Sequence, residues 1–125
     1  MNVTFVDNRL DEIWVQWQGG KCFEGHVFLG IIGPSSVESM VDFILMLAPD
    51  AIAIGHNLGH PDVTGSHVIR ELRARGWKGF VIANSGGGKE LFERDGIAVD
   101  ASADRDPHKL KQALDSLQTR TGETA

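Results

Sequence analysis

The sequence predicts a single α/β domain built on a parallel β-sheet with helices on both faces. Short apolar runs alternate with segments whose apolar residues recur every three to four positions, and Gly or Pro separates most of them. Alternating strands and helices favour parallel pairing, because each helical connection returns the chain to the start of the next strand. The 125 residues suffice for one such domain, and 42% hydrophobic with 23% charged residues is typical of a soluble protein.

Three strands and two helices are expected in the N-terminal half. The predicted strands are short apolar runs at Val3–Val6, His26–Ile32 and Ala51–Ile54. The predicted helices have apolar residues on one face, from Leu10 to Trp17 and from Val37 to Leu47. Ser35 and Glu38 have the spacing of a capping box, which indicates where the second of these helices begins.

The C-terminal half continues the alternation with shorter elements. Helices are expected at His67–Arg75, at Lys89–Arg94 and from Pro107 through Leu117, and strands at Phe80–Ala83 and Ile97–Val99. Residues 1–118 therefore make up the predicted domain. The polar residues 119–125 are expected to form a C-terminal tail that frays.

The expected strand order brings polar loops together. Right-handed crossovers favour the flavodoxin-like order 2-1-3-4-5, in which the loops after strands one, three and four meet at one edge of the sheet. Those loops contain Asp7-Asn8, Gly55 to His60, and Asn84-Ser85. Ligands of parallel-sheet proteins bind outside the carboxyl ends of the strands, so we expect the functional site among these residues.

Charge and composition disfavour several classes of partner. The net charge is −5 and no basic cluster occurs, which disfavours nucleic-acid binding. The apolar stretch Val41 to Leu47 is too short to cross a bilayer, and the N-terminus lacks the pattern of a signal peptide. A single cysteine, Cys22, excludes an internal disulfide and is compatible with a reducing compartment. We expect a cytoplasmic protein that binds neither nucleic acid nor membrane.

Four segments occur in the order typical of one protein family. They are Val6-Asp7-Asn8, Pro49 to Ile54, Pro61 to Gly65, and Val81 to Ser85. In this order they resemble the response-regulator receiver domain (CheY-like), over nearly the whole chain. The resemblance implies an acid pair that binds magnesium after the first strand and a phosphoacceptor aspartate at the end of the third. It also implies a hydroxyl residue after the fourth strand and a lysine after the fifth.

The phosphoacceptor position departs from the family. Counting forward from Pro49 places it at Gly55, and counting back from Pro61 places it at Asn57, with His56 between them. None of the three is an aspartate, so the acyl phosphate of the family cannot form there. Which of the three fills the position is left open by the sequence.

The positions that bind the cation and the phosphoryl group are also changed. Asn8 stands where the second acid is expected, so magnesium binding should be weak or lost, and no cofactor is expected. The lysine position falls near Ser102 or on Asp106, and neither is lysine. Asp7 and Ser85 alone match the family in residue type. The chain therefore resembles a degenerate pseudo-receiver that cannot be phosphorylated.

The resemblance implies a non-catalytic regulatory protein of two-component-type signal transduction. Its partner would be another signalling protein, either a histidine kinase, an output domain or a regulator, and a homodimer is a further alternative. The contact surface would be the face that phosphorylation remodels in true receivers, including Ser85, Val99 and Ala101.

A small enzyme or a ligand- or metal-binding domain is the alternative function. It would use the same crevice, with Asp7, His56 and Ser85 as its polar groups. The potential metal ligands are His56, His60, Asp62 and His67, whose imidazole and carboxylate groups suit zinc or another transition ion. No HExxH pattern, GxSxG nucleophile elbow or GxxxxGK[ST] phosphate loop supports a particular reaction.

Overall fold

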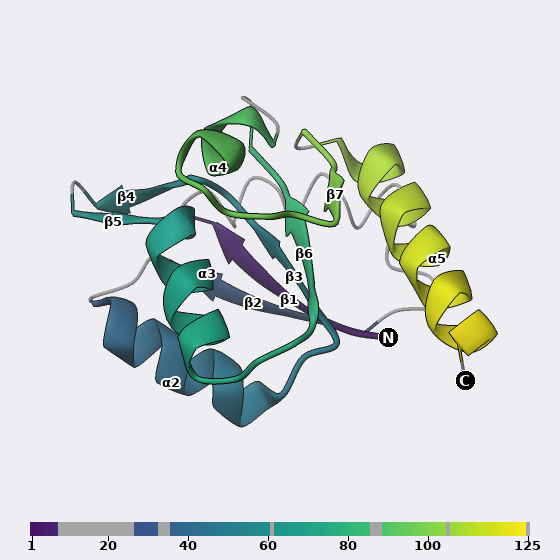
Figure 1. Ribbon diagram of the computed structural model, residues 1–125, viewed down its shortest axis with the longest axis horizontal. Helices are drawn as coiled ribbons and strands as arrows, with labels where there is room; N and C mark the ends of the chain where they lie inside the picture. The colour runs from purple at the N-terminus through teal and green to yellow at the C-terminus, as the bar shows by residue number, and fades with distance from the viewer. Residues whose placement is uncertain (8–26, 33–35, 61, 86–88, 105, 125) are drawn as a thin grey trace.

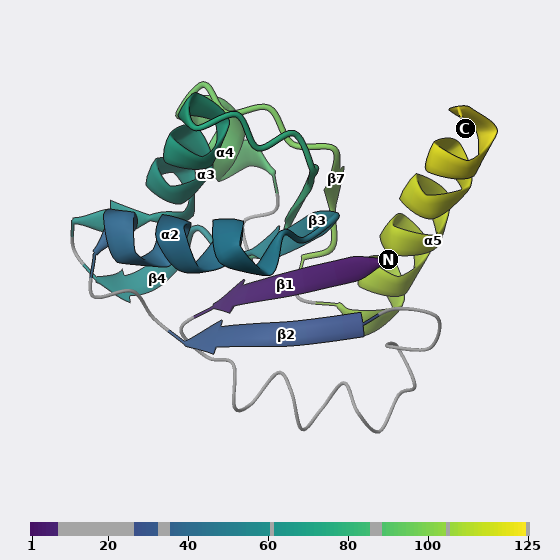
Figure 2. The same cartoon turned by 90° about the horizontal axis from the view of Figure 1, so that it is seen from below.

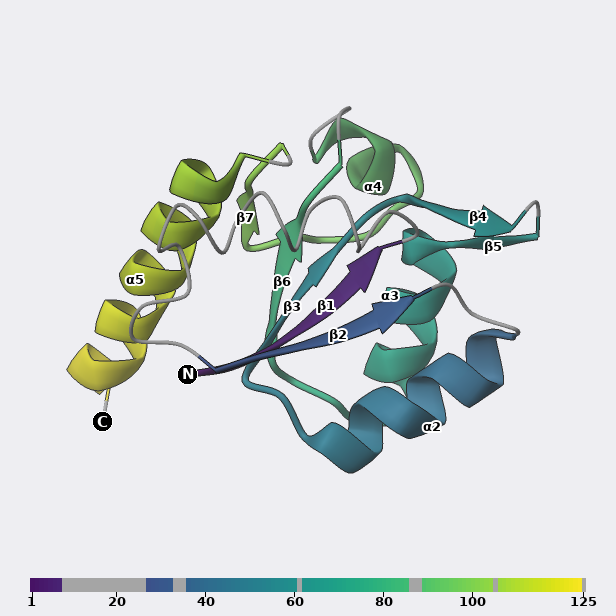
Figure 3. The same ribbon diagram turned by 180° about the vertical axis from the view of Figure 1, so that it is seen from behind.

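The computed structural model describes residues 1–7, 27–32, 36–60, 62–85, 89–104 and 106–124. This part of the chain contains a five-stranded parallel sheet with the strand order β2-β1-β3-β6-β7 (Figure 1). The strands are β1 (Asn2–Asp7), β2 (Val27–Ile32), β3 (Ala51–Ile54), β6 (Phe80–Ala83) and β7 (Ala101–Ser102). Counted within this sheet, the order is the expected 2-1-3-4-5. Figure 3 shows it from behind, from β2 at one edge to β7 beside α5.

Helices pack on both faces of the sheet. One face is covered by α2 (Val37–Leu47), α3 (Gly65–Ala74) and α4 (Glu90–Arg94), and the other by α5 (Pro107–Thr124). Figure 2 shows α2 and α3 together on one side of β1 and β2. Because side chains alternate along a strand, Ile52 and Ile54 join the core under α2, α3 and α4, whereas Ala51 and Ala53 join the core under α5.

Local sequence explains where two of the helices begin. Helix α2 has the expected bounds, but its N-cap is Ser36, whose Oγ accepts a hydrogen bond of 3.0 Å from the amide of Ser39. Helix α3 begins at Gly65, two residues before the expected start at His67, because Thr64 is its N-cap and forms a capping box with His67. The predicted capping residue Ser35 lies outside the described residues.

The last helix is longer than the sequence predicts. Helix α5 continues to Thr124, so the expectation of a separate tail over residues 119–125 is wrong as far as Thr124. Pro107 starts the helix, and buried Leu110, Leu114 and Leu117 hold it against the sheet. The hydroxyl of Thr119 donates to the carbonyl of Asp115 at 2.9 Å, which adds a bond inside the final turns.

The fifth strand of the sheet lies later in the chain than predicted. It is Ala101–Ser102 and not Ile97–Val99, because the pairing with β6 begins only at Ala101. Ile97 instead closes the end of α4, where its amide donates to the carbonyl of Phe92 at 2.9 Å, and its side chain joins the core under α2, α3 and α4. The apolar run Ile97–Val99 therefore belongs to a connection packed against the core and not to a strand.

A two-stranded antiparallel hairpin replaces the polar loop expected after β3. Its strands are β4 (Asn57–His60) and β5 (Val63–Thr64). Leu58 and Val63 are 2% and 6% exposed and join the same core cluster as α2 and α3. The hairpin is therefore anchored in the core, and it directs the chain straight into α3.

Part of the expected architecture falls outside the described residues. The helix predicted from Leu10 to Trp17 lies there, as does Asn8. Within the described ranges, no helix combines the length and apolar character that spanning a membrane requires.

Candidate functional site

Three strand ends bring buried residues to the edge of the sheet where the site was expected. Asp7 ends β1 and is fully buried. Gly55 follows β3, and its amide donates to the carbonyl of Val6 at 2.9 Å. Asn84 and Ser85 follow β6 and are buried as well. The sequence prediction that these three loops share one edge is therefore confirmed by the strand pairing.

Gly55 lies directly against Asp7. A Cβ atom built on Gly55 would be 3.1 Å from the carboxylate Oδ2 of Asp7, which is closer than most Cβ contacts. Any larger residue at position 55 therefore requires the Asp7 side chain to give way. Gly55 is thus a direct neighbour of the buried acid, whereas the imidazole of His56 contacts Asp95.

The start of α3 closes over Gly55. The amide of Gly65 donates to the carbonyl of His56 at 2.8 Å. A Cβ on Gly65 would be only 2.3 Å from the carbonyl oxygen of Gly55 and 3.0 Å from the ring of Phe92. The carbonyl oxygen of Gly55 can lie this close to residue 65 only because Gly65 has no side chain. Gly65 thus allows the start of α3 to pack directly against the backbone that follows β3.

His56 belongs to a different cluster from Asp7. Its Nε2 is 2.8 Å from Oδ2 of Asp95, and its ring packs edge-to-face against Phe92 with centroids 5.2 Å apart. Asp95 is the C-cap of α4. Since a carboxylate only accepts hydrogen bonds, Nε2 of His56 carries the proton in this pair. The alternative function grouped His56 with Asp7 and Ser85 as polar groups of one crevice, but the imidazole of His56 pairs with Asp95.

Asp95 connects α3 to α4. Its Oδ2 also accepts a 2.7 Å hydrogen bond from the hydroxyl of buried Ser66, and its backbone carbonyl accepts one of 3.0 Å from Nη2 of Arg70. The hydrogen bond from His56, followed by that from Ser66, lowers the pKa of Asp95 below its ordinary value of 3.8. Asp95 is thus held ionised. The Ser66 hydroxyl donates to this carboxylate, so it is not bonded to an imidazole as a catalytic nucleophile would be.

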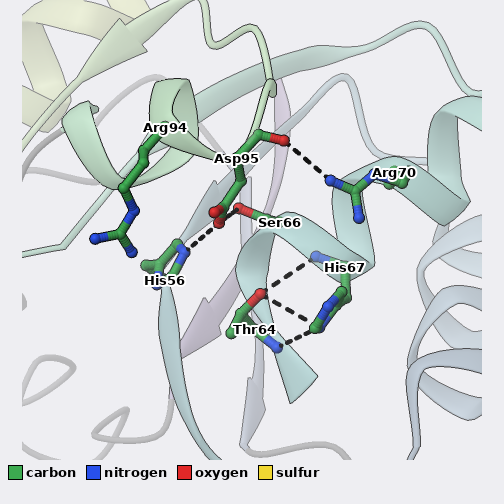
Figure 4. A pocket seen from close by; sticks show the side chains of 7 residues that line it. All are labelled: His56, Thr64, Ser66, His67, Arg70, Arg94 and Asp95. Atoms are coloured by element: carbon green, nitrogen blue, oxygen red, sulfur yellow. Dashed lines mark hydrogen bonds and ion pairs between the residues drawn. The ribbon is translucent and has the colours of Figure 1, made fainter. Parts of the chain in front are cut away.

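These residues line a pocket of about 350 Å³ between α3 and α4 (Figure 4). His56, Ser66 and Asp95 form one part of its wall. Thr64, His67, Arg70 and Arg94 complete it. Figure 4 shows the guanidinium group of Arg94 on the same side of Asp95 as His56, with Arg70 and His67 on the other side. No sequence pattern predicts this pocket, because Ser66, Arg70, Arg94 and Asp95 belong to no recognisable motif.

The remaining predicted residues make local contacts. Asn57 is exposed, and its Oδ1 accepts a 2.9 Å hydrogen bond from the amide of Gly59 inside the hairpin. Nδ1 of His67 accepts one of 3.1 Å from the amide of Thr64 at the start of α3. Asp62 is exposed in the hairpin turn, and His60 lies in β4 with its side chain outside the description. Among the described residues, no three His, Cys, Asp or Glu side chains are grouped as metal ligands.

The residues of the predicted contact surface differ in exposure. Val99 and Ala101 are partly exposed along the approach to β7 and within it. Ser85 is only 4% exposed, so the expectation that it contributes to a contact surface is wrong. It follows β6.

Comparison with known proteins identifies the architecture. No protein-family model matches the chain, and no curated protein matches it. Among solved structures, the N-terminal domain of an uncharacterized protein from Wolinella succinogenes has a TM-score of 0.71 and 17% identity, covering 100% of this chain and 99% of the other. A DNA-binding response regulator of the LuxR family from Staphylococcus aureus has a TM-score of 0.70 and 15% identity, covering 92% and 96%. The fold is that of a receiver domain.

A further match to the receiver fold gives the same result. A two-component response regulator of the LuxR family from Aurantimonas sp. SI85-9A1 has a TM-score of 0.67 and 13% identity, covering 93% of this chain and 83% of the other. At these identities the likeness establishes the receiver fold, and function has to be argued from the site.

Proposed function

We propose that this protein is a receiver-like regulatory protein that accepts no phosphoryl group and acts by binding another signalling protein. The observation that carries the proposal is the position of Gly55, which follows β3 directly beside the buried carboxylate of Asp7. The resemblance places the phosphoacceptor aspartate at the end of the third strand of the sheet, and of the three residues that the sequence leaves open we propose Gly55 for that position. Glycine has no side-chain oxygen, so an acyl phosphate cannot form on it.

The packing around Gly55 supports the same conclusion. A Cβ at position 55 would be 3.1 Å from Oδ2 of Asp7 and 3.7 Å from the carbonyl oxygen of Asn57, so protein atoms already lie beside Gly55. An aspartate at this position, with or without a phosphoryl group, would require these neighbours to move. Divalent cations with oxygen ligands need several carboxylate or carbonyl donors, and the sequence offers Asp7-Asn8 in place of two acids. We therefore expect weak magnesium binding or none.

The proposed partner is a histidine kinase, an output domain or another regulator of a two-component-type pathway. Two of the structures with the same fold are response regulators, which is the basis for this class of partner. Val99 and Ala101, both partly exposed, are the proposed centre of the contact surface. Without phosphorylation, the protein would act in one conformation or respond to another ligand.

Phosphorylation can be tested directly. The purified protein is incubated with acetyl phosphate and magnesium, in parallel with a receiver domain that has an intact acceptor aspartate, and intact mass is measured over time. We expect no phosphoryl adduct on this protein under conditions that modify the control. A stoichiometric adduct that hydroxylamine removes would contradict the proposal. The variants Asp7→Asn and Asp62→Asn would then identify the acceptor.

The contact surface can be tested by NMR. Isotopically labelled protein is titrated with candidate kinase and output domains, and we expect saturable shifts at residues 97–103 with at least one of them. Ala101→Asp should remove the interaction, whereas Met46→Asp, at a side chain 72% exposed on α2, should retain it. Shifts confined to α2 would contradict the proposed contact surface at Val99 and Ala101.

A further inference from the structure

The pocket between α3 and α4 is a second polar site, separate from the Asp7–Gly55 contact. Two guanidinium groups and two imidazoles line it against a single carboxylate (Figure 4). The chain as a whole has a net charge of −5, so a pocket with two guanidinium groups and one carboxylate is unlike the average of the molecule. Such a pocket attracts anions by its local field.

Arg94 offers the most available donors. Its guanidinium makes no hydrogen bond to any other residue in the described part of the chain, although its charge acts on Asp95. Arg70 uses one nitrogen, Nη2, for the carbonyl of Asp95 at 3.0 Å and keeps its remaining N–H groups. A guanidinium group presents five N–H donors in a planar fork that matches phosphate oxygens.

His67 adds a donor whose tautomer is fixed by the fold. Its Nδ1 accepts the amide hydrogen of Thr64 at 3.1 Å, so this nitrogen has no proton in the neutral ring. The proton is therefore on Nε2, which is not used by the capping box. A neutral His67 can thus donate a hydrogen bond from Nε2 to an anion in the pocket.

The carboxylate in the pocket is already engaged by the protein. Oδ2 of Asp95 accepts hydrogen bonds from His56 at 2.8 Å and from buried Ser66 at 2.7 Å. These bonds hold the carboxylate against the wall formed by α3 and offset part of its repulsion of an anion. They also fix the end of α4, and with it the neighbouring residue Arg94, relative to α3.

We propose that this pocket binds a small molecule that bears a phosphate group. The volume of about 350 Å³ lies within the range of small-ligand pockets, roughly 300–1,000 Å³, and exceeds what a simple inorganic ion fills. The two guanidinium groups come from α4 and α3 and lie on either side of Asp95, so together they suit a ligand with several phosphate oxygens better than a single carboxylate. The inference is independent of the proposed function, since it concerns neither Gly55 nor the partner surface.

Binding can be measured by NMR titration of labelled protein at constant pH and ionic strength. The probes are pyrophosphate, inorganic phosphate and, as a dicarboxylate, malonate. We expect saturable shifts with pyrophosphate at the amides of residues 64–67 and 94–96, weaker binding of phosphate, and the weakest binding of malonate. Equal affinity for malonate and pyrophosphate would overturn the assignment to phosphate.

Three arginine variants make the test specific. Arg94→Gln breaks no hydrogen bond in the described structure and should raise the dissociation constant for pyrophosphate at least about tenfold. Arg70→Gln should act in the same direction. Arg73→Gln is the matched control, because Arg73 lies on α3 outside the pocket and contacts Trp77. Unchanged affinity in Arg94→Gln, or an equal loss in Arg73→Gln, would overturn the proposal.

Discussion

His56 and Asp95 are 39 positions apart in the chain, yet Nε2 of one lies 2.8 Å from Oδ2 of the other. This pair joins the loop after β3 to the end of α4, and Ser66 connects the same carboxylate to α3. Three elements therefore meet at one carboxylate oxygen. Their relative positions should depend on its ionisation.

Acidification should weaken this junction by protonating the carboxylate of Asp95. Its pKa is lower in the folded protein than the ordinary 3.8, so the ionised form stabilises the fold above about pH 4. That contribution is lost as the pH falls through the lower folded value. We expect urea unfolding midpoints of the wild type to drop over this range more than those of Asp95→Asn.

The control for this prediction is Glu90→Gln, at an exposed acid on the same helix. It should keep the acid dependence of the wild type. If Asp95→Asn and the wild type lose stability in parallel on acidification, the junction does not depend on the charge of Asp95.

Gly65→Ala should strongly destabilise the protein. Its Cβ would be 2.3 Å from the backbone oxygen of Gly55, so the start of α3 must move away from the residue that follows β3, at an expected cost of about 2–4 kcal/mol in the free energy of unfolding. Gly76→Ala is the comparison, because Gly76 has φ of +91° but open space around it, so it carries only conformational strain of about 1 kcal/mol. Chemical denaturation measures both, and equal losses would contradict the close approach.

Phe92→Ala should remove support from both the core and His56. The ring is fully buried and meets the imidazole edge-to-face, so its loss should cost about 3–5 kcal/mol. Phe92→Leu keeps most of the volume and should recover much of this stability but not the aromatic contact. The ring resonances of His56 should therefore shift in both variants, whereas unfolding midpoints should separate them.

Ser36→Ala tests the start of α2. The substitution leaves the amide of Ser39 without its 3.0 Å partner and should cost about 1 kcal/mol. Ser36→Asn retains a capping oxygen and should remain close to the wild type. A loss equal to that of Ser36→Ala would show that the hydroxyl does more than cap the helix.

Much of the fold could be predicted from periodicity alone. Val37 to Leu47 and Ala51 to Ile54 were predicted with the bounds that the structure has, because apolar spacing and turn residues agree there. Ile97 misled the prediction, since a residue buried by a connection has the same apolar signature as one in a strand. Leu58 and Val63 are too widely separated by Gly, His and Pro to indicate a hairpin before tertiary packing is known.

The site was harder to predict, because contacts between distant residues decide it. Asp7 and Gly55 were identified from the strand order, since parallel pairing places strand ends side by side. His56 was assigned to the same group because it is adjacent to Gly55 in the sequence. Its side chain instead pairs with Asp95, which belongs to no recognisable sequence motif. Successive residues in a turn can serve separate clusters, and sequence spacing does not distinguish them.

The close contact between Gly55 and Asp7 also determines what Gly55→Asp would produce. Two carboxyl groups would be forced together in a buried place, where like charges cannot both be ionised without a counterion. The titrations of the two carboxyl groups would then be coupled. A single substitution at position 55 would therefore create an acidic pair at the end of β3.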